Sequence, residues 1–186
     1  MHQVKNKIYG SNYEALNKEL EPFRNQGKKI VMCSGTFDLF HIGHMRLLAT
    51  AKTYGDVLIV AVKSDKAASL KKEDPPVICQ DDRMEAIAHC VSSDYVVLAE
   101  YDVMKALPRE FKYDNTSSFE WLTIFTPVIR TIRPNIFVHE DNPQISEARQ
   151  QLFELCGIEG IKNPRTPGIS STEIIECIKL RLLRKM

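Results

Sequence analysis

Short, continuous apolar runs alternate along this chain with stretches whose apolar residues recur at helical spacing. Continuous apolar runs of this length are typical of strands buried on both faces of a parallel sheet. The strand-like runs are residues 30–33, 56–62, 94–98, 135–139 and 160–162. Helical spacing is found at residues 45–54, 81–90, 127–132, 146–156 and 171–183. The alternation predicts an α/β fold: a doubly wound, mainly parallel sheet of about five strands with helices on both faces.

A further helix is expected ahead of the first strand. Ser11 and Glu14 have the spacing of a capping box, which marks a helix start, and Gly27 would end the helix. Its apolar residues are Tyr13, Leu16, Leu20 and Phe23. We therefore interpret residues 1–28 as an N-terminal helical extension and residues 29–186 as one domain.

The composition narrows the class of protein. A chain of 186 residues with 44% hydrophobic content, 8 Gly and 9 Pro is suited to one globular domain with a proper core. Its formal charge of +1, from 25 basic and 24 acidic residues, argues against extended nucleic-acid or anionic-membrane binding and favours a small partner. The 5 cysteines lack C-x-x-C spacing, so we expect reduced thiols, mostly in apolar surroundings. Without a signal peptide or long apolar span, the sequence predicts a soluble, cytoplasmic protein.

The segment 30–44, IVMCSGTFDLFHIGH, joins a strand, a tight polar turn and a helix start. Gly35 lets a ligand approach the main chain, and the helix start offers unpaired N–H groups and a positive dipole end to an anion. His41 and His44 are three residues apart, so both rings can face one ligand. A zinc site would need a third ligand, and nothing nearby resembles a metal cluster. Two ordinary surface histidines are the other alternative, but their place after this strand and turn favours a phosphate-binding loop.

A second candidate anion site lies in residues 164–172, PRTPGISST. Gly168 permits a sharp turn, and the hydroxyl residues 170–172 stand at the start of the last predicted helix. A simple serine helix cap would account for the hydroxyls. It would not account for Arg165, whose forked guanidinium suits phosphate oxygens.

Together the two segments resemble a known family. GTFDLFHIGH resembles the signature of the nucleotidyltransferase superfamily, the H-x-G-H enzymes distantly related to class I aminoacyl-tRNA synthetases. PRTPGISST resembles the Arg-Thr-x-Gly-Ile-Ser-Thr-Thr motif of cytidylyltransferases that act on glycerol 3-phosphate, phosphocholine and phosphoethanolamine. The resemblance implies a Rossmann-like homodimer that transfers CMP from CTP to a phosphorylated small alcohol and releases pyrophosphate. Mg²⁺ would bridge the triphosphate, without a metal site of the protein's own.

The resemblance also implies roles for individual residues. The expected catalytic residues are His41, His44, Lys71 and Arg165, with both histidines at the α-phosphate. The expected nucleotide-binding residues are Gly35, Thr36, Phe37, His41, His44, Asp141, Arg165, Gly168, Ile169, Ser170, Ser171 and Thr172. The expected acceptor-binding residues are Asp38 and Lys71. For Lys71 the alternative is a solvated surface lysine, and for Asp141 it is a carboxylate that caps the following helix.

Three stretches depart from the family pattern. Relatives carry an arginine shortly before the position of Asp94, where this chain has only Val and Ser. The acidic turn 140–143 is closer to the His-Asp-Asp-x-Pro turn of phosphocholine cytidylyltransferases than to the Gly-Asp turn of the glycerol enzymes. Residues 100–126 exceed the connection usual in small bacterial relatives, and their aromatic content predicts a structured insertion whose rings mainly pack. Thr126 and Pro127 would then cap and begin a helix.

Three functions are compatible with these observations. The first is a CTP-dependent cytidylyltransferase, which the lead of Arg165 into the serine run favours. The second is an adenylyltransferase of the same fold, which would make an ADP-sugar or a dinucleotide cofactor. The third is a nucleotide-binding protein that has lost catalysis, against which both His41 and His44 argue.

Overall fold

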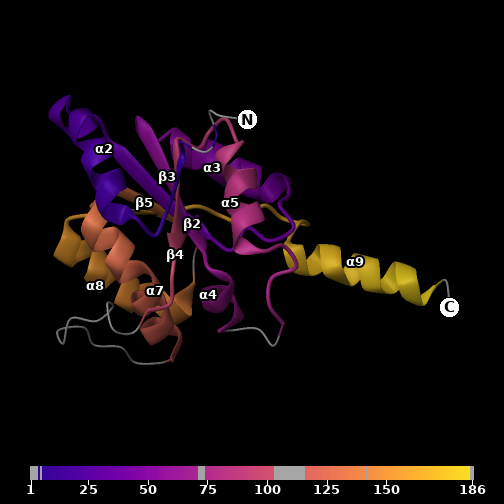
Figure 1. Cartoon of the computed structure of the whole chain (residues 1–186). Helices are drawn as coiled ribbons and strands as arrows, with labels where there is room; N and C mark the ends of the chain where they lie inside the picture. The colour runs from indigo at the N-terminus through magenta and orange to yellow at the C-terminus, as the bar shows by residue number, and fades with distance from the viewer. Residues whose placement is uncertain (1–3, 5, 71–73, 103–115, 141, 185–186) are drawn as a thin grey trace.

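A parallel sheet of six strands, in the order β1-β4-β3-β2-β5-β6, forms the centre of the molecule (Figure 1). The computed structural model describes residues 4, 6–70, 74–102, 116–140 and 142–184. The strands are β1 (Ile8–Gly10), β2 (Ile30–Gly35), β3 (Val57–Lys63), β4 (Tyr95–Ala99), β5 (Ile136–His139) and β6 (Glu159–Lys162). Every pairing between them is parallel. The predicted α/β class is therefore confirmed, with one strand more than the five expected.

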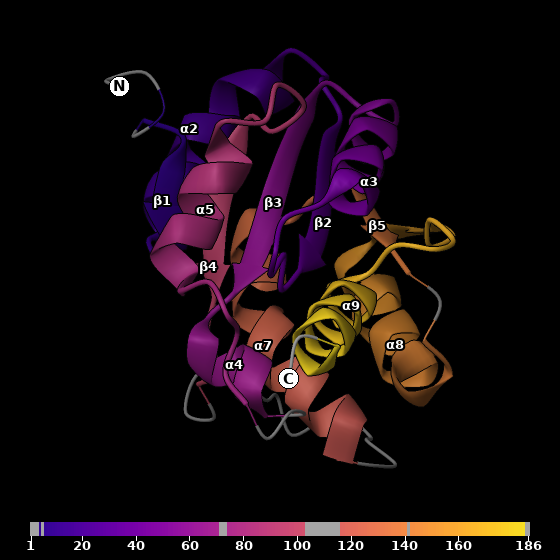
Figure 2. The same ribbon diagram turned by 90° about the vertical axis from the view of Figure 1, so that its right-hand side faces the viewer.

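Helices cover both faces of this sheet (Figure 2). The helices that the structure describes are α2 (Tyr13–Asn25), α3 (Ile42–Lys52), α4 (Asp65–Ser69), α5 (Gln80–Ala88), α7 (Thr116–Ile132), the 3₁₀ turn η1 (Pro143–Ile145), α8 (Ser146–Cys156) and α9 (Ser171–Leu183), of which α9 does not cover the sheet. Alternate residues of each strand enter opposite cores, because side chains alternate across a strand. Ile30 and Met32 of β2 pack with α2, α7 and α8, whereas Val31 and Cys33 pack with α3 and α5.

The sheet has its switch point between β2 and β5. From β2 the chain builds outward through β3 to β4 on one side, and then returns through β5 to β6 on the other. Val31, Met32 and Cys33 of β2 pair with the first three residues of β5, so the carboxyl ends of both strands lie together. In open α/β sheets a crevice forms at this point, outside the strand ends, and there ligands bind.

The N-terminal segment contains a strand as well as a helix. β1 pairs with β4 and extends the sheet, and at three residues it is too short to show a period in the sequence. The predicted capping box of Ser11 and Glu14 is wrong, because α2 begins at Tyr13 and Asn12 caps it. The Asn12 side chain accepts the Ala15 N–H at 3.2 Å. Asparagine and serine are about equally good helix caps, so the local sequence does not distinguish Ser11 from Asn12 as the cap.

The helix predicted to have Thr126 as its cap and Pro127 as its first residue already includes Thr116, and Pro127 lies inside it. A proline within a helix costs about 3 kcal/mol. Burying one large apolar side chain offsets about 1.5–3 kcal/mol, and α7 buries several, among them Trp121 and Phe125. Tertiary packing therefore overrides the proline signal. The expected packing role of these two rings is confirmed, whereas residues 103–115 of the predicted insertion lie outside the described part of the chain.

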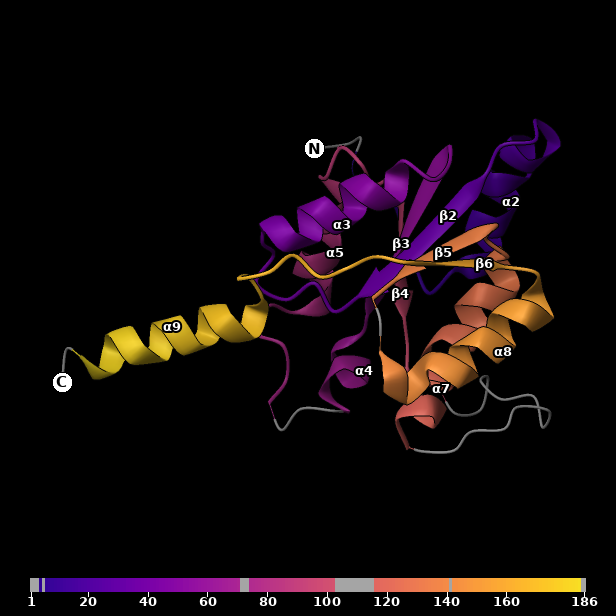
Figure 3. The same ribbon diagram turned by 180° about the vertical axis from the view of Figure 1, so that it is seen from behind.

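The last helix, α9, projects away from the body of the molecule (Figures 1 and 3). None of its side chains is buried, and Ile178, Leu182 and Leu183 are among its exposed apolar residues. Of the helices that the structure describes, none combines the length and the apolar character needed to cross a membrane.

The environment of the cysteines differs from the expectation. Cys33 is buried in the core, but Cys79 and Cys177 are exposed. Cys79 is the N-cap residue of α5, and Cys177 lies on α9, none of whose side chains is buried.

Candidate active site

The loop after β2 has a strained backbone, and hydrogen bonds to the carboxylate of Asp38 hold it in place. Phe37 and Leu39 have φ angles of 58° and 44°. This left-handed region costs a non-glycine residue roughly 1–2 kcal/mol. The buried Asp38 carboxylate accepts the N–H groups of Leu39, Val77 and Ile78, each at 3.0 Å. Asp38 thus holds the loop in this conformation, and the three N–H groups satisfy the hydrogen-bonding capacity of its carboxylate within the protein.

Arg83 holds the same loop from the other side. Its side chain is fully buried and donates to the carbonyl oxygens of Thr36 and of Ile78, the latter at 2.9 Å. It also forms an ion pair with Asp65 at 2.6 Å. A guanidinium with five N–H donors can tie three segments at once, so this arginine positions the loop rather than a ligand.

The loop in turn positions His44. A β-carbon on Gly35 would lie 3.0 Å from the Phe37 ring, so glycine leaves room for that ring to fold back over the end of β2. The Phe37 ring meets His44 edge-on at 5.2 Å, and the Phe40 ring stacks on His44 at 5.5 Å. His44 is therefore held between two aromatic rings.

Hydrogen bonds at the start of α3 orient both histidines. His41 caps the helix, and its Nδ1 accepts the Gly43 N–H at 3.1 Å. Nδ1 of His44 accepts the His41 N–H at 3.4 Å, and the two rings stack with centroids 3.8 Å apart. Because Nδ1 accepts in both rings, each neutral imidazole carries its proton on Nε2. The pair therefore offers two Nε2–H donors.

The histidines are neutral at physiological pH. Burial and the neighbouring His41 lower the pKa of His44 to about 4, against an opposing effect of Asp38. Burial also lowers the pKa of His41, which Glu173 partly opposes. In the protein without a bound anion, the two rings therefore present hydrogen-bond donors at neutral pH and no positive charge.

The second motif meets this loop in space. After β6 the chain runs past the sheet to the start of α9, beside α3 (Figure 3). Gly168 has φ 72° in this run, as its predicted sharp turn requires. Ser170 caps α9 by accepting the Glu173 N–H at 3.1 Å, and Ser171 Oγ donates to the Asp38 carbonyl oxygen at 2.6 Å. This last bond joins the two sequence motifs directly.

A cleft of about 190 Å³ lies where the motifs meet. His41 and His44 line one wall, and Arg165 and residues 169–172 line the other. The cleft combines Nε2–H donors, hydroxyl groups, a guanidinium and a helix N-terminus, which together are suited to a chain of phosphates.

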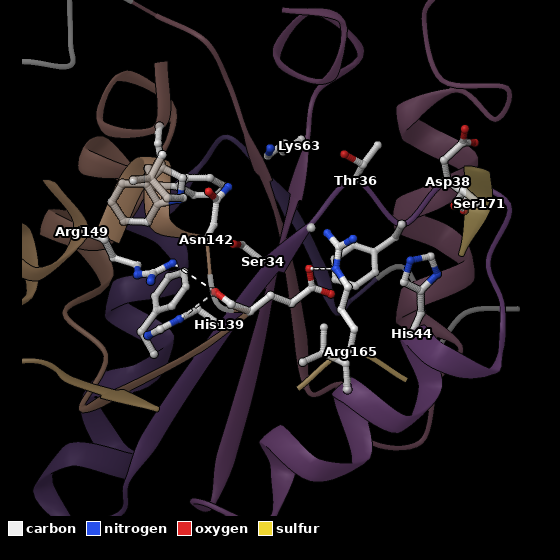
Figure 4. Close-up of a pocket in the computed structure, with 18 of the residues that line it drawn as sticks. Ser34, Thr36, Asp38, His44, Lys63, His139, Asn142, Arg149, Arg165 and Ser171 are labelled. Atoms are coloured by element: carbon white, nitrogen blue, oxygen red, sulfur yellow. Dashed lines mark hydrogen bonds and ion pairs between the residues drawn. The ribbon is translucent and has the colours of Figure 1, made fainter. Parts of the chain in front are cut away.

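A larger cavity of about 590 Å³ adjoins this cleft, beyond the carboxyl ends of β2, β3 and β5 (Figure 4). The two spaces share His44, Arg165 and Ser171 in their walls. On the side of the motifs the cavity is also lined by Thr36 and Asp38. On the far side it is lined by Lys63, Trp121, His139, Asn142 and Arg149.

Glu140 lines this cavity and contacts residues on both of its sides. Its carboxylate accepts from Nε of Arg165 at 2.6 Å. Its carbonyl oxygen accepts from Arg149 at 3.2 Å and lies 3.0 Å from Nδ1 of His139. Arg165, predicted as a phosphate ligand, is thus paired with a carboxylate within the protein.

Most of the predicted site residues come together in these two spaces. Gly168 shapes the turn without lining either space, and Lys71 and Asp141 lie outside the described residues. Sequence reasoning missed Ser34 of β2 and the polar residues of the far side, which are Lys63, His139, Asn142 and Arg149. Polar residues at the ends of predicted strands, such as Lys63, were an available signal for them.

No group of three or more His, Cys, Asp or Glu side chains in the described part of the chain could hold a metal ion. Mg²⁺ is usually bound through substrate phosphates and water, with few protein ligands. The donor set of the cleft fits a magnesium–triphosphate complex whose ion is held by the nucleotide.

Comparison with known proteins agrees with this geometry. The family model described as Cytidylyltransferase-like matches residues 32–177. The chain is 37% identical over 112 residues to the bifunctional protein HldE of Aliarcobacter butzleri, covering 58% of this chain and 24% of that protein. It is 29% identical over 168 residues to HldE of Desulfatibacillum aliphaticivorans, covering 89% of this chain and 30% of that protein. The chain thus spans about a quarter of the length of these curated relatives.

Two solved structures share the fold. Pantoate-β-alanine ligase from Francisella tularensis, in complex with β-γ ATP and β-alanine, has a TM-score of 0.63 at 17% identity, covering 96% of this chain and 79% of that one. A lipopolysaccharide core biosynthesis protein from Thermoplasma volcanium has a TM-score of 0.52 at 20% identity, covering 75% of this chain and 98% of that one. At such identities the likeness concerns the fold alone.

Proposed function

Because the chain belongs to the cytidylyltransferase-like family of the nucleotidyltransferase superfamily, we propose that it transfers CMP from CTP to a phosphorylated small alcohol. The single observation that carries this proposal is the cleft in which the histidine pair faces Arg165 and the start of α9. The adjoining cavity offers space for an acceptor next to it.

The chemistry requires positioning and charge stabilisation. A phosphomonoester has a second pKa of about 6, so near neutral pH its oxygens are already ionised nucleophiles and need no general base. One of these oxygens attacks the α-phosphorus and forms a new P–O bond. The α–β anhydride bond breaks, and its electron pair leaves with pyrophosphate. Negative charge builds up on the transferring and leaving groups, so hydrogen-bond donors aimed at them lower the barrier.

The donors of the cleft supply these contacts. The Nε2–H groups of His41 and His44 bind the α-phosphate oxygens, while Arg165, Ser171 and Thr172 hold the β- and γ-phosphates. Mg²⁺ bound to the triphosphate would neutralise part of its charge. The roles of Lys71 and Asp141 at the nucleotide, and of Lys71 and Asp38 at the acceptor, remain part of this proposal.

An adenylyltransferase is the second candidate. The structure of the pantoate-β-alanine ligase, which has the same fold, contains β-γ ATP. The donors that line the cleft would contact phosphates and not the base, so they do not distinguish CTP from ATP. The family description and the PRTPGISST segment favour CTP. Pyrophosphate release over the four common nucleoside triphosphates decides between the two, and release with ATP but not with CTP would replace the first candidate by the second.

Replacing His44 separates an enzyme from a protein that only binds nucleotide. Loss of one transition-state donor typically lowers turnover by about 10²–10³, so His44→Ala should reduce kcat by that factor. The matched control is His89→Ala, since His89 is exposed at the end of α5 and outside both spaces. A His44→Ala protein with near-normal turnover, or a wild-type protein that binds nucleotide without any release, would contradict the proposal.

The predicted homodimer and cytoplasmic location also remain proposals. Light scattering of the purified chain measures the first, and fractionation of cells that express it measures the second.

A further inference from the structure

The last helix, α9, projects from the body of the molecule and carries an uncovered apolar face (Figures 1 and 3). None of its side chains is buried. Ile174 and Ile175 are half-buried near the body, while Ile178 and Leu182 are 50% and 61% exposed. These four residues recur at helical spacing and therefore share one side of the helix. We call them the α9 stripe.

We propose that the α9 stripe packs against the α9 stripe of a second copy of this chain, with the two helices antiparallel and the pair centred near Ile178. In this arrangement the basic end of each α9 lies beside the start of the other, where the phosphate cleft opens. The pairing itself does not depend on the proposed function, whereas its effect on nucleotide binding in the cleft rests on that function.

The first argument is that α9 needs a packing partner in order to remain a helix. It has 13 residues, and isolated helices shorter than about 12–15 residues are only marginally stable in water. Most helices in proteins are stabilised by packing of an apolar face. Within the described part of the chain, Ile178 and Leu182 receive too little of this packing to be buried. A second copy would supply the contact.

The second argument is the distribution of charge along α9, which selects both the partner and its direction. The first half of the helix carries Glu173 and Glu176, and the second half, with its C-cap residue, carries Lys179, Arg181 and Arg184. Two antiparallel copies place each acidic half beside a basic half, whereas parallel copies would place like charges together. The opposed helix dipoles favour the same direction. The helix is thus complementary to itself, as a two-fold symmetric interface requires.

A membrane surface is the main alternative partner for an exposed amphipathic helix. Helices that lie on anionic membranes have a polar face rich in Lys and Arg. In α9 the two glutamates offset two of the three basic side chains, so residues 171–184 have a net charge of only +1. Charge therefore favours a second copy over an anionic membrane.

The pair would act on the phosphate cleft through the start of α9. Ser170 caps this helix, and Ser170, Ser171 and Thr172 line the cleft. Pairing stabilises the helix to which these residues belong, and it brings the basic half of the partner helix to the same end. Positive charge near the cleft favours a bound triphosphate. We therefore expect the dimer to bind the Mg²⁺ complex of CTP more tightly than the monomer does.

Sedimentation equilibrium of the full chain, without nucleotide, measures the pairing. Two helices of this length bury less than the roughly 1,600 Å² of a standard interface, so we expect a dimer Kd in the micromolar range. Ile178→Lys places a charge at the centre of both stripes and should raise this Kd at least tenfold. The matched control is Leu180→Lys, since Leu180 is 56% exposed on the same helix but lies on the side away from the stripe. It should change the Kd less than threefold.

Cys177 reports the direction of the pairing. It is exposed and lies one residue from the centre of the proposed pair. In an antiparallel pair the two-fold axis brings both Cys177 side chains to the same side, where a bismaleimide linker of about 10 Å, close to the distance between packed helix axes, joins them. We expect a cross-linked dimer that Cys177→Ser abolishes. Cys79→Ser, which removes the other exposed cysteine, should leave cross-linking unchanged.

The pairing is overturned by a chain that stays monomeric throughout the micromolar range, by an unchanged dimer Kd in Ile178→Lys, or by cross-linking that persists in Cys177→Ser. It is also overturned if the monomeric chain binds vesicles of phosphatidylserine and phosphatidylcholine and Ile178→Lys abolishes that binding, because α9 then docks on lipid.

Equilibrium dialysis with the Mg²⁺ complex of CTP tests the effect on the cleft and separates it from the proposed function. Ile178→Lys should bind CTP at least threefold more weakly than the wild type, and the added lysine cannot itself weaken the binding of an anion. Equal binding would overturn the effect on the cleft and leave the pairing standing. If neither protein binds any nucleotide but the wild type dimerises through α9, the proposed function fails and the pairing stands.

Discussion

Gly43, between the two histidines, sets the tightest steric limit in the candidate active site. A β-carbon built on it lies 2.9 Å from Cε1 and 3.0 Å from Nδ1 of His41, and 3.4 Å from a methyl group of Ile169. The His41 ring cannot yield toward His44, because their centroids are already 3.8 Å apart. In Gly43→Ala the ring must therefore leave the Gly43 N–H that orients it.

The size of the effect follows from these distances. Ordinary contact begins at 3.4 Å, so the His41 ring must move by about 0.5 Å. Misplacing a reacting group by 1 Å can cost about 10²-fold in rate, so we expect kcat to fall roughly 10- to 100-fold. Loss of the cap costs about 1 kcal/mol, and alanine in place of glycine in a helix offsets up to about 1 kcal/mol. The free energy of unfolding should therefore change by less than about 1 kcal/mol.

Steady-state pyrophosphate release and urea unfolding, followed by the fluorescence of Trp121, measure the two quantities. The matched control is Gly55→Ala, where the β-carbon would lie 2.6 Å from Val31 Cγ2 and 2.8 Å from the Lys29 carbonyl oxygen, away from the site. This overpacking should cost about 1–3 kcal/mol of stability and leave kcat of the folded enzyme unchanged. Turnover of Gly43→Ala within threefold of the wild type would refute the reasoning.

Three other predictions concern the groups that support the site. Arg83→Met leaves two carbonyl oxygens without their donor and Asp65 without its ion-pair partner, so the free energy of unfolding in urea should fall by about 2–4 kcal/mol. A fall below about 1 kcal/mol would mean that water replaces the guanidinium. Glu140→Gln releases Arg165 from an exposed ion pair worth up to about 1 kcal/mol, so the nucleotide KM in steady-state kinetics should fall up to about fivefold. A rise in this KM would contradict the idea that Arg165 leaves Glu140 to bind the nucleotide phosphates. In the folded protein the pKa of His44 is lowered from 6.5 to about 4. As pH falls below 6.5, the imidazole of His44 therefore takes up a proton in the unfolded chain before it does so in the folded one, and the free energy of unfolding decreases between pH 6.5 and about pH 4. After solvent screening we expect this loss to be about 1 kcal/mol, and urea unfolding at pH 7 and pH 5 should show a smaller difference in His44→Gln.

The sequence predicted the central elements well where their signal was local. The run 56–62 was identified as a strand because a strand buried on both faces must be apolar almost throughout, and β3 spans Val57–Lys63. α8 and α9 were predicted with the bounds that the structure shows. The errors at β1 and α7 arose where a tertiary contact outweighed a local rule. β1 owes its place to pairing with β4, and α7 continues through Pro127 because its buried face favours the helix.

By itself the sequence indicated the family and the two candidate phosphate-binding segments, because Gly35, the histidine spacing and the serine run carry their signal in residue type and local order. Only the tertiary structure shows which other residues these two segments contact. The bond from Ser171 to Asp38 joins residues 133 positions apart, and local spacing holds no information about such a contact. The far side of the large cavity, with Lys63 and Arg149, arises in the same way. Its residues come from the ends of β3 and β5 and from α7 and α8, and they become neighbours because the order of the sheet brings these strand ends to one crevice.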